Sequence, residues 1–303
     1  MRFTFLLPAY KSAYLAEAIS GILKQTFTDF NLIVSDDASP EPIKKIVESF
    51  DDGRITYRRN GVNYGAERLV GHWNLLVQEC TGEFLIMASD DDVYDERFLE
   101  EINCLIESNP DKDLFAARCR IIGRDGETVR EEPDRGSLTG FGDICSFLTA
   151  PDSILCLGNY VFRTSALKAA GGFVNFPYAW KADSATILMM GGNGCAKTSP
   201  ALFSFRMSGE NISSRKNDAE VCRKKLEAVL GFKEWSDRLF ASKDFDSTLV
   251  RKNISRRLEG ELRDYYRVLS FKDFFRLYRR LLKEKWFYSV RNKLSFAFSY
   301  FVR

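Results

Sequence analysis

Apolar residues fall into two alternating patterns along the first 110 residues. Short, almost wholly apolar runs occur at 3–7, 30–34 and 84–88. Runs of this kind are typical of strands buried on both faces. The longer segments between them repeat their apolar residues every three or four positions, as amphipathic helices do. Alternation of strands and helices predicts βαβ units and a parallel sheet, so the chain is expected to be an α/β protein.

The pattern changes in the second half of the chain. A further apolar run at 114–122 leads into an Asp125-Gly126 turn, which predicts a hairpin and therefore a mixed, mostly parallel sheet flanked by helices. From about residue 218 onward the sequence is helical, polar and rich in aromatic residues, with no further strand pattern. We therefore expect an α/β domain over 1–215 and a helical C-terminal extension over 216–303.

The net charge of +2 conceals an uneven distribution. Residues 251–303 contain 15 Lys and Arg against 5 Asp and Glu, whereas the remainder contains 29 against 37. An acidic body with a basic tail does not favour nucleic acid as a partner.

The cysteines and the lengths of the apolar runs indicate the cellular compartment of the protein. Seven cysteines are spread singly, without a CxxC pair and mostly among apolar neighbours. This usage is typical of buried, reduced thiols in a cytoplasmic protein. The sequence is expected to lack a signal peptide, because a strand pattern begins almost at once. No uncharged apolar run approaches the roughly 18 residues that a membrane-spanning helix needs.

Three consecutive carboxylates follow the apolar run at 84–88. Asp90, Asp91 and Asp92 would repel one another unless a cation lay among them. Hard oxygen ligands at the end of a parallel strand favour Mn²⁺ or Mg²⁺, and these ions in turn favour a phosphate-bearing ligand. Asp90 with Asp91, or Asp90 with Asp92, would both suit the ion. The alternative is a solvated acidic turn that caps the next helix.

Several short motifs recur in order along this stretch. The chain begins FTFLLPAYKS, continues with Gln25-Thr26-Phe27, and its second apolar run ends in Asp36-Asp37-Ala38-Ser39. Asn63-Tyr64-Gly65, Asn74 and Thr81-Gly82-Glu83 then precede the acidic triplet. In this order and spacing the sequence resembles the family 2 glycosyltransferases, which are inverting enzymes with the GT-A (nucleotide-diphospho-sugar transferase) fold. The likeness is close over residues 1 to about 110 and looser to about 213.

The resemblance implies roles for individual residues. Residues after the first strand and acids after the second would hold the nucleobase and ribose of the donor, the acidic triplet would hold the metal ion, and Arg206 would pair with the diphosphate. For Tyr10 the alternative is an ordinary half-buried aromatic, and for Asp37 a helix cap. The expected nucleotide-sugar ligands are Pro8, Ala9, Tyr10, Asp36, Asp37, Asn63, Gly65, Asp90 and Arg206.

Inversion at the anomeric carbon needs a general base that takes a proton from the acceptor hydroxyl. The resemblance places this base, an Asp, at a helix start well beyond the metal motif. Asp183 is the single carboxylate between Asp152 and Glu210, so it is the candidate. The alternative is that Asp183 merely caps the helix that begins there. His72 is the chain's single histidine, which excludes catalysis based on a Ser-His-Asp triad or on histidine metal ligands. It is expected to be structural or to line the site weakly.

The basic tail suggests a further partner. Apolar residues recur at helical spacing over 270–303, and the opposite face is rich in Lys and Arg. A basic amphipathic helix of this kind is typical of contact with an anionic membrane, although packing on the catalytic domain would produce the same pattern. The apolar positions are Phe271, Phe274, Phe275, Tyr278, Leu281, Leu282, Phe287, Val290, Leu294, Phe298 and Phe301.

Together these features predict a metal-dependent glycosyltransferase. It would move a sugar from a nucleotide-sugar donor, UDP-linked, to a glycan or lipid-linked acceptor in polysaccharide synthesis, at the inner face of the membrane. The alternatives are a metal-dependent nucleotidyl or phosphoryl transferase and an inactive, membrane-docked scaffold. The first would need a Gly-rich, basic phosphate loop near the N-terminus, which LLPAYKSAYL lacks.

Overall fold

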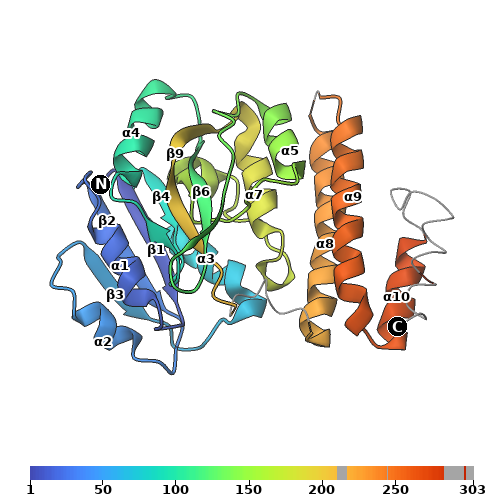
Figure 1. Cartoon of the computed structure of the whole chain (residues 1–303), viewed down its shortest axis with the longest axis horizontal. Helices are drawn as coiled ribbons and strands as arrows, with labels where there is room; N and C mark the ends of the chain where they lie inside the picture. Colours follow the sequence, from blue (N-terminus) through green and yellow to red (C-terminus); the bar gives the residue numbers. More distant parts are fainter. Residues whose placement is uncertain (210–216, 244, 283–296, 298–303) are drawn as a thin grey trace. The chain divides into compact units, whose positions relative to one another are not determined.

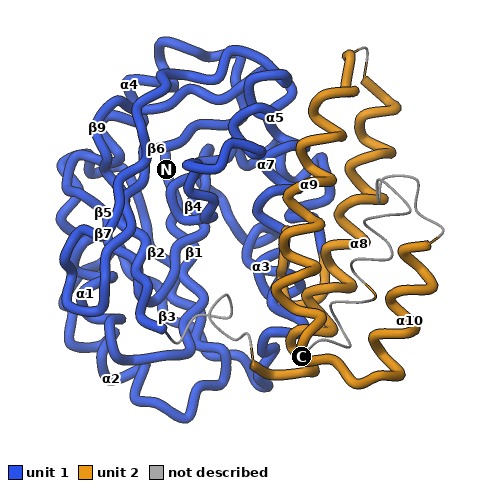
Figure 2. Tube along the Cα trace, turned by 45° about the vertical axis from the view of Figure 1, so that its right-hand side comes forward, with its two compact units in different colours: residues 1–175, 182–209 blue, residues 176–181, 210–303 orange. Residues whose placement is uncertain are grey.

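The computed structural model describes residues 1–209, 217–243, 245–282 and 297. The chain divides into two compact units (Figure 2). Unit 1 consists of Met1–Asn175 and Ala182–Gly209, and unit 2 consists of Phe176–Lys181 and Glu210–Arg303. The predicted boundary at 215 falls among residues outside the described ranges. Unit 2 also includes the short segment 176–181, which was expected within the α/β domain.

Unit 1 is built on a nine-stranded sheet that runs through its middle, with helices on either side (Figure 1). The strands are β1 (Phe3–Ala9), β2 (Phe30–Asp36), β3 (Ile55–Arg59), β4 (Phe84–Met87), β5 (Val93–Tyr94), β6 (Leu114–Ile122), β7 (Thr128–Glu131), β8 (Tyr160–Arg163) and β9 (Ala196–Arg206). The α-helices are α1 (Leu15–Leu23), α2 (Ile43–Glu48), α3 (Leu69–Glu79), α4 (Phe98–Ser108), α5 (Phe141–Thr149), α6 (Thr164–Ala169) and α7 (Ala182–Met190).

The sheet is mixed, as predicted. Its order is β3-β2-β1-β4-β8-β6-β9-β5, with β7 paired to β6. Strands β3, β2, β1 and β4 are parallel neighbours, and β6 pairs with β9 in parallel, whereas β8, β5 and β7 are antiparallel. The hairpin expected at Asp125-Gly126 joins β6 to β7, and Gly126 takes a φ of 88° in the turn.

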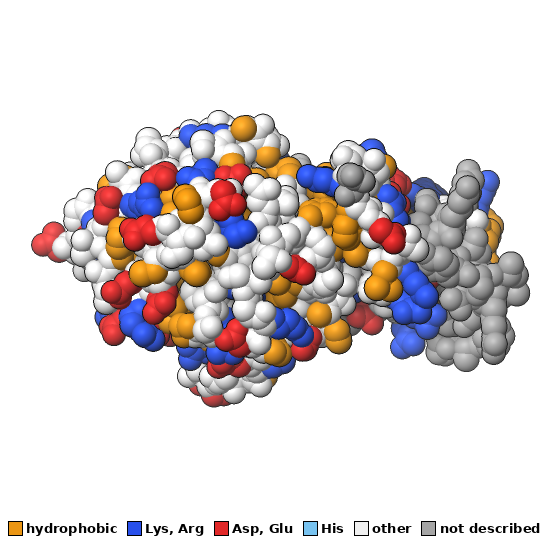
Figure 3. Space-filling model, turned by 90° about the horizontal axis from the view of Figure 1, so that it is seen from above, with side chains coloured by type: hydrophobic (Ala, Val, Ile, Leu, Met, Phe, Trp, Pro, Cys, Tyr) orange, Lys and Arg blue, Asp and Glu red, His pale blue; other side chains and the backbone are white. Residues whose placement is uncertain are grey.

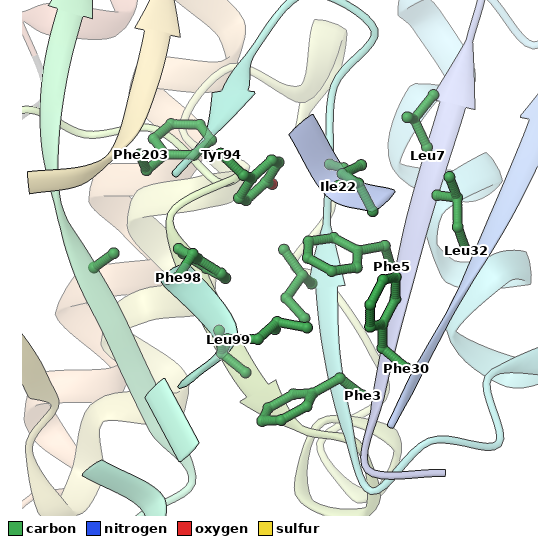
Figure 4. Close-up of a cluster of buried hydrophobic side chains, with 14 of the residues drawn as sticks. Phe3, Phe5, Leu7, Ile22, Phe30, Leu32, Tyr94, Phe98, Leu99 and Phe203 are labelled. Carbon is green, nitrogen blue, oxygen red and sulfur yellow. The ribbon is translucent and has the colours of Figure 1, made fainter. Parts of the chain in front are cut away.

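The apolar runs of the sequence form the core between the sheet and its helices, whereas acidic and basic side chains are intermixed on the surface seen in Figure 3. Phe3, Phe5, Phe30 and Phe98 are all buried, and their rings lie together with Tyr94 in Figure 4. Phe5 makes edge-to-face contacts with Phe30 and Tyr94, at centroid distances of 5.9 and 5.1 Å. Such contacts add specificity to the apolar burial that stabilises the sheet. They also fix the strands whose carboxyl ends carry the candidate site.

Unit 2 contains the helices α8 (Ala219–Ala241), α9 (Thr248–Tyr265) and α10 (Phe271–Leu281), together with the short 3₁₀ turn η2 (Pro177–Ala179). Asp218 caps α8 by accepting hydrogen bonds from the backbone N–H groups of Glu220 and Val221, as an N-cap residue does. Among the described helices, none has the length and apolar character required to cross a membrane. The predicted apolar positions from Phe287 onward lie outside the described residues.

Candidate active site

The loops that follow β1, β2 and β4 meet at one edge of the sheet. The registers pair Ala9 with Asp36 and Leu6 with Met87, so these three parallel strands end side by side. Asp90 joins two of the loops directly. Its Oδ2 accepts hydrogen bonds from the backbone N–H groups of Tyr10, at 2.9 Å, and Lys11, at 2.8 Å. In this fold, ligands bind beyond such strand ends.

Tyr10 is well placed to meet a ligand. Its backbone is fixed on both sides, because its N–H donates to Asp90 and its carbonyl accepts a hydrogen bond from the Ser39 hydroxyl. Its side chain is 41% exposed, whereas Ala9 before it is fully buried and Pro8 is half-buried. The ring is therefore presented to solvent on a rigid backbone, as a base-stacking residue requires.

Two carboxyl groups of the acidic triplet have strongly raised pKa values. Burial raises the pKa of Asp90 to about 6, against the lowering effect of the two backbone N–H groups. Burial and the nearby charge of Asp91 raise the pKa of Asp92 well above its usual range. Asp91 is buried and accepts a hydrogen bond from the Ser89 hydroxyl. Three carboxylates held together in this way favour the approach of a cation.

The triplet fits a divalent ion that is completed by a ligand. Among the described residues, no three His, Cys, Asp or Glu side chains form a ready-made set of metal ligands. Mg²⁺ and Mn²⁺ are commonly held by one or two carboxylates together with substrate phosphates, so they do not require such a set. Asp90, Asp91 and Asp92 carry hard oxygen atoms of the kind that these ions prefer, and a cation among them would offset their mutual repulsion.

Arg206 lies beneath the triplet at the end of β9. Its backbone N–H donates to Asp92 Oδ1 at 3.0 Å, and its Nε donates to the carbonyl of Asp91 at 3.0 Å. The guanidinium also forms an ion pair with Glu17 at 2.7 Å and stacks over the Tyr14 ring at 4.4 Å. Arg206 is 1% exposed. Arg206 therefore fixes the acidic loop through hydrogen bonds to Asp91 and Asp92. Its pairing with a diphosphate stays a prediction.

Asp36 and Asp37, at the end of β2, are both buried and both engaged by protein groups. Asp36 accepts hydrogen bonds from the backbone N–H of Ser39 and the hydroxyl of Tyr57, each at 2.8 Å, and pairs with Arg59. Asp37 accepts from the side-chain amide of Asn60, at 2.9 Å. Asp36 thus links two strand ends, and Asp37 anchors the loop that follows β3.

The Asn63-Tyr64-Gly65 motif forms that loop. The N–H groups of Tyr64 and Gly65 donate to the Asp37 carboxylate at 3.0 to 3.1 Å. Gly65 takes a φ of 56°, which favours glycine, and a Cβ there would lie 3.3 Å from Asn63 Oδ1. Asn63 Oδ1 is itself buried, with no hydrogen-bond partner among the described residues. The predicted ligand residues Asp37, Asn63 and Gly65 therefore form one connected structure.

His72 supports this loop from α3. It is fully buried, stacks on Tyr64 at 5.1 Å, and its Nε2 lies 2.8 Å from the Ser35 hydroxyl and 3.1 Å from the Asn60 amide. Burial lowers the pKa of His72, and the nearby Asp37 carboxylate opposes this effect. These contacts agree with the structural role expected for the single histidine.

Asp183 occupies the first turn of α7 and is half-buried. Its Oδ1 accepts hydrogen bonds from the backbone N–H of Ser184, at 2.6 Å, and from the Ser184 hydroxyl, at 3.2 Å. Both of these bonds are local to the beginning of α7.

Sequence reasoning missed the residues that hold the site together. Glu17 and Tyr14 fix Arg206, and Tyr57 and Arg59 fix Asp36. A buried arginine at a strand end needs a counter-charge, but the sequence does not indicate which distant carboxylate provides it.

Comparison with known proteins identifies the family. The model described as "Glycosyl transferase family 2" matches residues 4–169, more than half of the chain. The chain belongs to this family. Solved structures that are similar to this chain have the GT-A fold predicted from the sequence. The Staphylococcus aureus enzyme TarS, residues 1–349 with UDP-GlcNAc, has a TM-score of 0.58 at 19% identity and covers 88% of this chain and 83% of its own.

Other proteins similar to this family 2 member have a lower sequence identity or a shorter match. The mannosyltransferase PcManGT of Pyrobaculum calidifontis, solved with GDP-Man and Mn²⁺, has a TM-score of 0.59 at 14% identity, over 99% of this chain and 80% of its own. The Escherichia coli enzyme WfgD, "UDP-Glc:alpha-D-GlcNAc-diphosphoundecaprenol beta-1,3-glucosyltransferase", is 29% identical over 108 residues, 35% of this chain and 42% of its own.

A Campylobacter jejuni enzyme, "GalNAc(5)-diNAcBac-PP-undecaprenol beta-1,3-glucosyltransferase", is 35% identical over 94 residues, 30% of each chain. The chain therefore matches less than half of the length of these curated relatives. The names of these relatives describe transferases that act on undecaprenol-linked glycans or on poly(ribitol-phosphate).

Proposed function

We propose that this family 2 enzyme transfers a sugar, with inversion, from a UDP-linked donor to a glycan or lipid-linked acceptor. The observation that carries the proposal is the pair of hydrogen bonds from Tyr10 and Lys11 to Asp90. They hold the nucleotide-side loop of β1 against the acidic triplet, so a nucleoside and its diphosphate would find their ligands at adjoining positions.

The donor would lie along this edge of the sheet. Tyr10 would stack on the base, and the Asp36, Asp37, Asn63 and Gly65 structure would line the nucleoside end. Asn63 Oδ1 supports this assignment, since it is a buried acceptor without a partner among the described residues. Pro8 and Ala9 would shape the floor beside Tyr10.

Asp90, Asp91 and Asp92 would hold a Mn²⁺ or Mg²⁺ ion, which acts as a Lewis acid on the departing diphosphate when bound. The chain's own contribution is to hold these carboxylates close together in a largely buried loop. Arg206 would keep the loop in place from below, and its positive charge would add to the field that favours a leaving diphosphate.

Asp183 would act as the general base. A carboxylate takes the proton of the acceptor hydroxyl as that oxygen attacks the anomeric carbon from the face opposite the diphosphate, which produces inversion. The hydrogen bonds from Ser184 orient the Asp183 carboxylate at the start of α7.

Nucleotide release under defined conditions tests this function. The full-length protein would be incubated with UDP-glucose, UDP-GlcNAc or GDP-mannose and Mn²⁺, and the freed nucleoside diphosphate measured, with water as acceptor. We expect release from a UDP-sugar that stops on addition of EDTA and returns with Mn²⁺. Asp183→Asn should lower kcat by about 10²- to 10⁴-fold and leave UDP binding unchanged. Wild-type turnover by this variant would contradict the assignment of the base.

The acceptor side is proposed to lie at an anionic membrane surface, on its cytoplasmic face. In α10, Phe271 and Phe275 stack on each other at 6.2 Å and are 58% and 50% exposed, next to the exposed cation Arg276. Aromatic rings beside cations suit an anionic lipid interface.

Vesicle flotation tests the membrane proposal. The intact protein should float with vesicles that contain phosphatidylglycerol and remain at the bottom with phosphatidylcholine alone. Phe271→Ser with Phe275→Ser should abolish flotation, since both rings are exposed and their loss should not disturb folding. Equal flotation of the variant and the wild type would contradict this role for α10.

A further inference from the structure

Asp183 follows a short excursion of the chain out of unit 1. The chain leaves unit 1 after Asn175 and returns at Ala182. Both ends are anchored in unit 1. Before the excursion, Asn74 exchanges two hydrogen bonds with the backbone of Phe173, and after it the Thr186 hydroxyl accepts a hydrogen bond from the N–H of Val174. The residues between, 176–181, belong to unit 2.

The backbone of this segment is strained. Tyr178, Ala179 and Lys181 take φ values of 58°, 53° and 73°. Of the non-glycine residues that the structure describes, the only other one with a positive φ is Ala38. Such conformations are unfavourable for residues with a Cβ, and they persist only where surrounding contacts enforce them. Three such conformations within four residues therefore require stabilising contacts from other parts of the protein.

Unit 2 supplies such contacts through Glu261 of α9. One carboxylate oxygen accepts a hydrogen bond from Trp180 Nε1 at 3.1 Å, and the other forms an ion pair with Lys181. The side chains of Glu261 and Lys181 are 16% and 11% exposed, so this pair is largely shielded from water. A shielded, charge-assisted contact is stronger than an exposed one.

Aromatic contacts complete this stabilisation. Phe176 packs against Phe232 and Trp235 of α8, with centroid distances of 6.2 and 6.5 Å. Trp180 packs edge-on against Tyr265 at 6.0 Å. The fully buried Lys225 of α8 places its Nζ 4.5 Å from the centre of the Trp180 ring. The segment is thus fixed by side chains at both of its ends.

The position of this segment matters for catalysis, because Lys181 is separated from Asp183 by a single residue. If Lys181 relaxed to a negative φ, the direction of the chain into α7 would change. The Thr186 anchor would still hold the second turn of the helix, so the change would fall on its first turn. That turn carries Asp183.

We infer that Glu261, assisted by Lys225, is a positioning residue for the general base. By clamping Trp180 and Lys181, it forces the strained backbone that aims the Asp183 carboxylate. The inference rests on the proposed function, which makes Asp183 the base. It also gives the helical unit a part in catalysis in addition to any contact with a membrane.

The test compares Glu261→Ala and Glu261→Gln with Glu234→Gln in the full-length protein. Glu234 is a matched control, because it forms an ion pair with Arg280 within the same unit and, among the described residues, makes no hydrogen bond or ion pair with segment 176–181. Nucleotide release from the UDP-sugar would give kcat and KM. Hydrogen exchange would report the amides of Ala179 and Trp180, which donate to the carbonyls of Phe176 and Pro177.

We expect Glu261→Ala to lower kcat by about 10²-fold, the cost of a misplacement of roughly 1 Å, with donor KM and UDP affinity within about twofold. The amides of Ala179 and Trp180 should exchange faster in this variant. Glu261→Gln should recover part of kcat, because an amide oxygen can still accept from Trp180 Nε1. Glu234→Gln should resemble the wild type in both measurements.

Two results would overturn the inference. One is a kcat for Glu261→Ala equal to that of Glu234→Gln. The other is a loss of kcat together with UDP affinity, which would indicate general destabilisation. Asp183→Asn separates the two proposals. If that variant is inactive while Glu261→Ala is fully active, the positioning role fails and the base assignment stands; if Asp183→Asn is active, the base assignment fails.

Discussion

Arg206 in unit 1 and Lys225 in unit 2 are both buried cations, at 1% and 0% exposure, but they are held by different chemistry. Arg206 donates to the backbone carbonyls of Asp91, Gly123 and Arg124. Lys225 lies against the faces of two aromatic rings, with its Nζ 4.5 Å from the centre of Trp180 and 5.1 Å from that of Tyr265.

The difference follows from the two side chains. A guanidinium is planar and carries five donors in a fixed fork, which suits several carbonyls around a loop. An ammonium is a compact charge that a ring quadrupole can attract from many directions. Arg206 therefore supports the acidic triplet through directional hydrogen bonds, whereas the contacts of Lys225 with the Trp180 and Tyr265 rings are less directional. Replacement of each cation should reveal this contrast.

Arg206→Met should have the largest effect. It removes the donors for three carbonyls, and each buried carbonyl left unpaired costs about 1 to 3 kcal/mol, so the free energy of unfolding should fall by about 3 to 5 kcal/mol. Urea denaturation followed by circular dichroism measures this change. Arg206→Lys should recover only part of it, since an ammonium cannot reproduce the fork. Equal stability of Arg206→Lys and the wild type would contradict the directional support proposed for this loop.

Lys225→Met should have a smaller effect. Methionine retains most of the side-chain volume, and the attraction of the two rings for the charge is worth about 1 to 2 kcal/mol. Urea denaturation of this variant beside Arg206→Met gives the ranking directly. A larger loss for Lys225→Met than for Arg206→Met would reverse the comparison between the two units.

His72→Gln should change the pH dependence of stability in a defined direction. Burial lowers the pKa of folded His72, with Asp37 and Arg58 as the charged neighbours, so the unfolded chain binds the proton more readily. Stability from neutral His72 is thus present above the unfolded pKa of about 6.5 and is lost as pH falls below it. In urea denaturation from pH 7.5 to 5, the wild type should lose more stability than His72→Gln.

Asp90 titrates in the same pH range, and its raised pKa acts in the opposite sense, since the folded state binds its proton more readily. Both proteins contain Asp90, so the difference between them isolates His72. A difference that is independent of pH would exclude His72 as the source.

Glu17→Gln should have the smallest effect. Glu17 is 52% exposed at the side chain, so solvent screens its ion pair with Arg206, and its loss should cost about 0 to 1 kcal/mol. Urea denaturation next to Arg206→Met separates the carbonyl contacts from the ion pair. A loss close to that of Arg206→Met would assign the support of the loop to the ion pair.

The positions of most residues proposed to bind the nucleotide-sugar donor could be predicted, because they follow strands whose order the sequence indicates. Parallel strands end at one edge, so the residues after β1, β2 and β4 were expected together, and Asp90 does contact Tyr10 and Lys11. The apolar runs likewise predicted the buried strands and the mixed sheet.

The supports of the site could not be predicted, since they depend on side-chain contacts over long sequence distances. Glu17 meets Arg206, and Glu261 meets Trp180, without any local pattern in the sequence. The positive φ values of Tyr178 and Ala179 also had no sequence signal, because such conformations usually indicate Gly or Asn. Tertiary contacts override the local preference there.

The excursion at 176–181 also restricts how the protein can be divided. A fragment that ends at residue 215 would retain Phe176, Trp180 and Lys181 but lack α8 and α9, which hold them. Two large aromatic side chains would then lose their apolar partners, and such exposed surface promotes aggregation. Expression trials should therefore keep 176–181 together with the C-terminal helices. Exchanges of the helical unit between related enzymes should transfer both segments together.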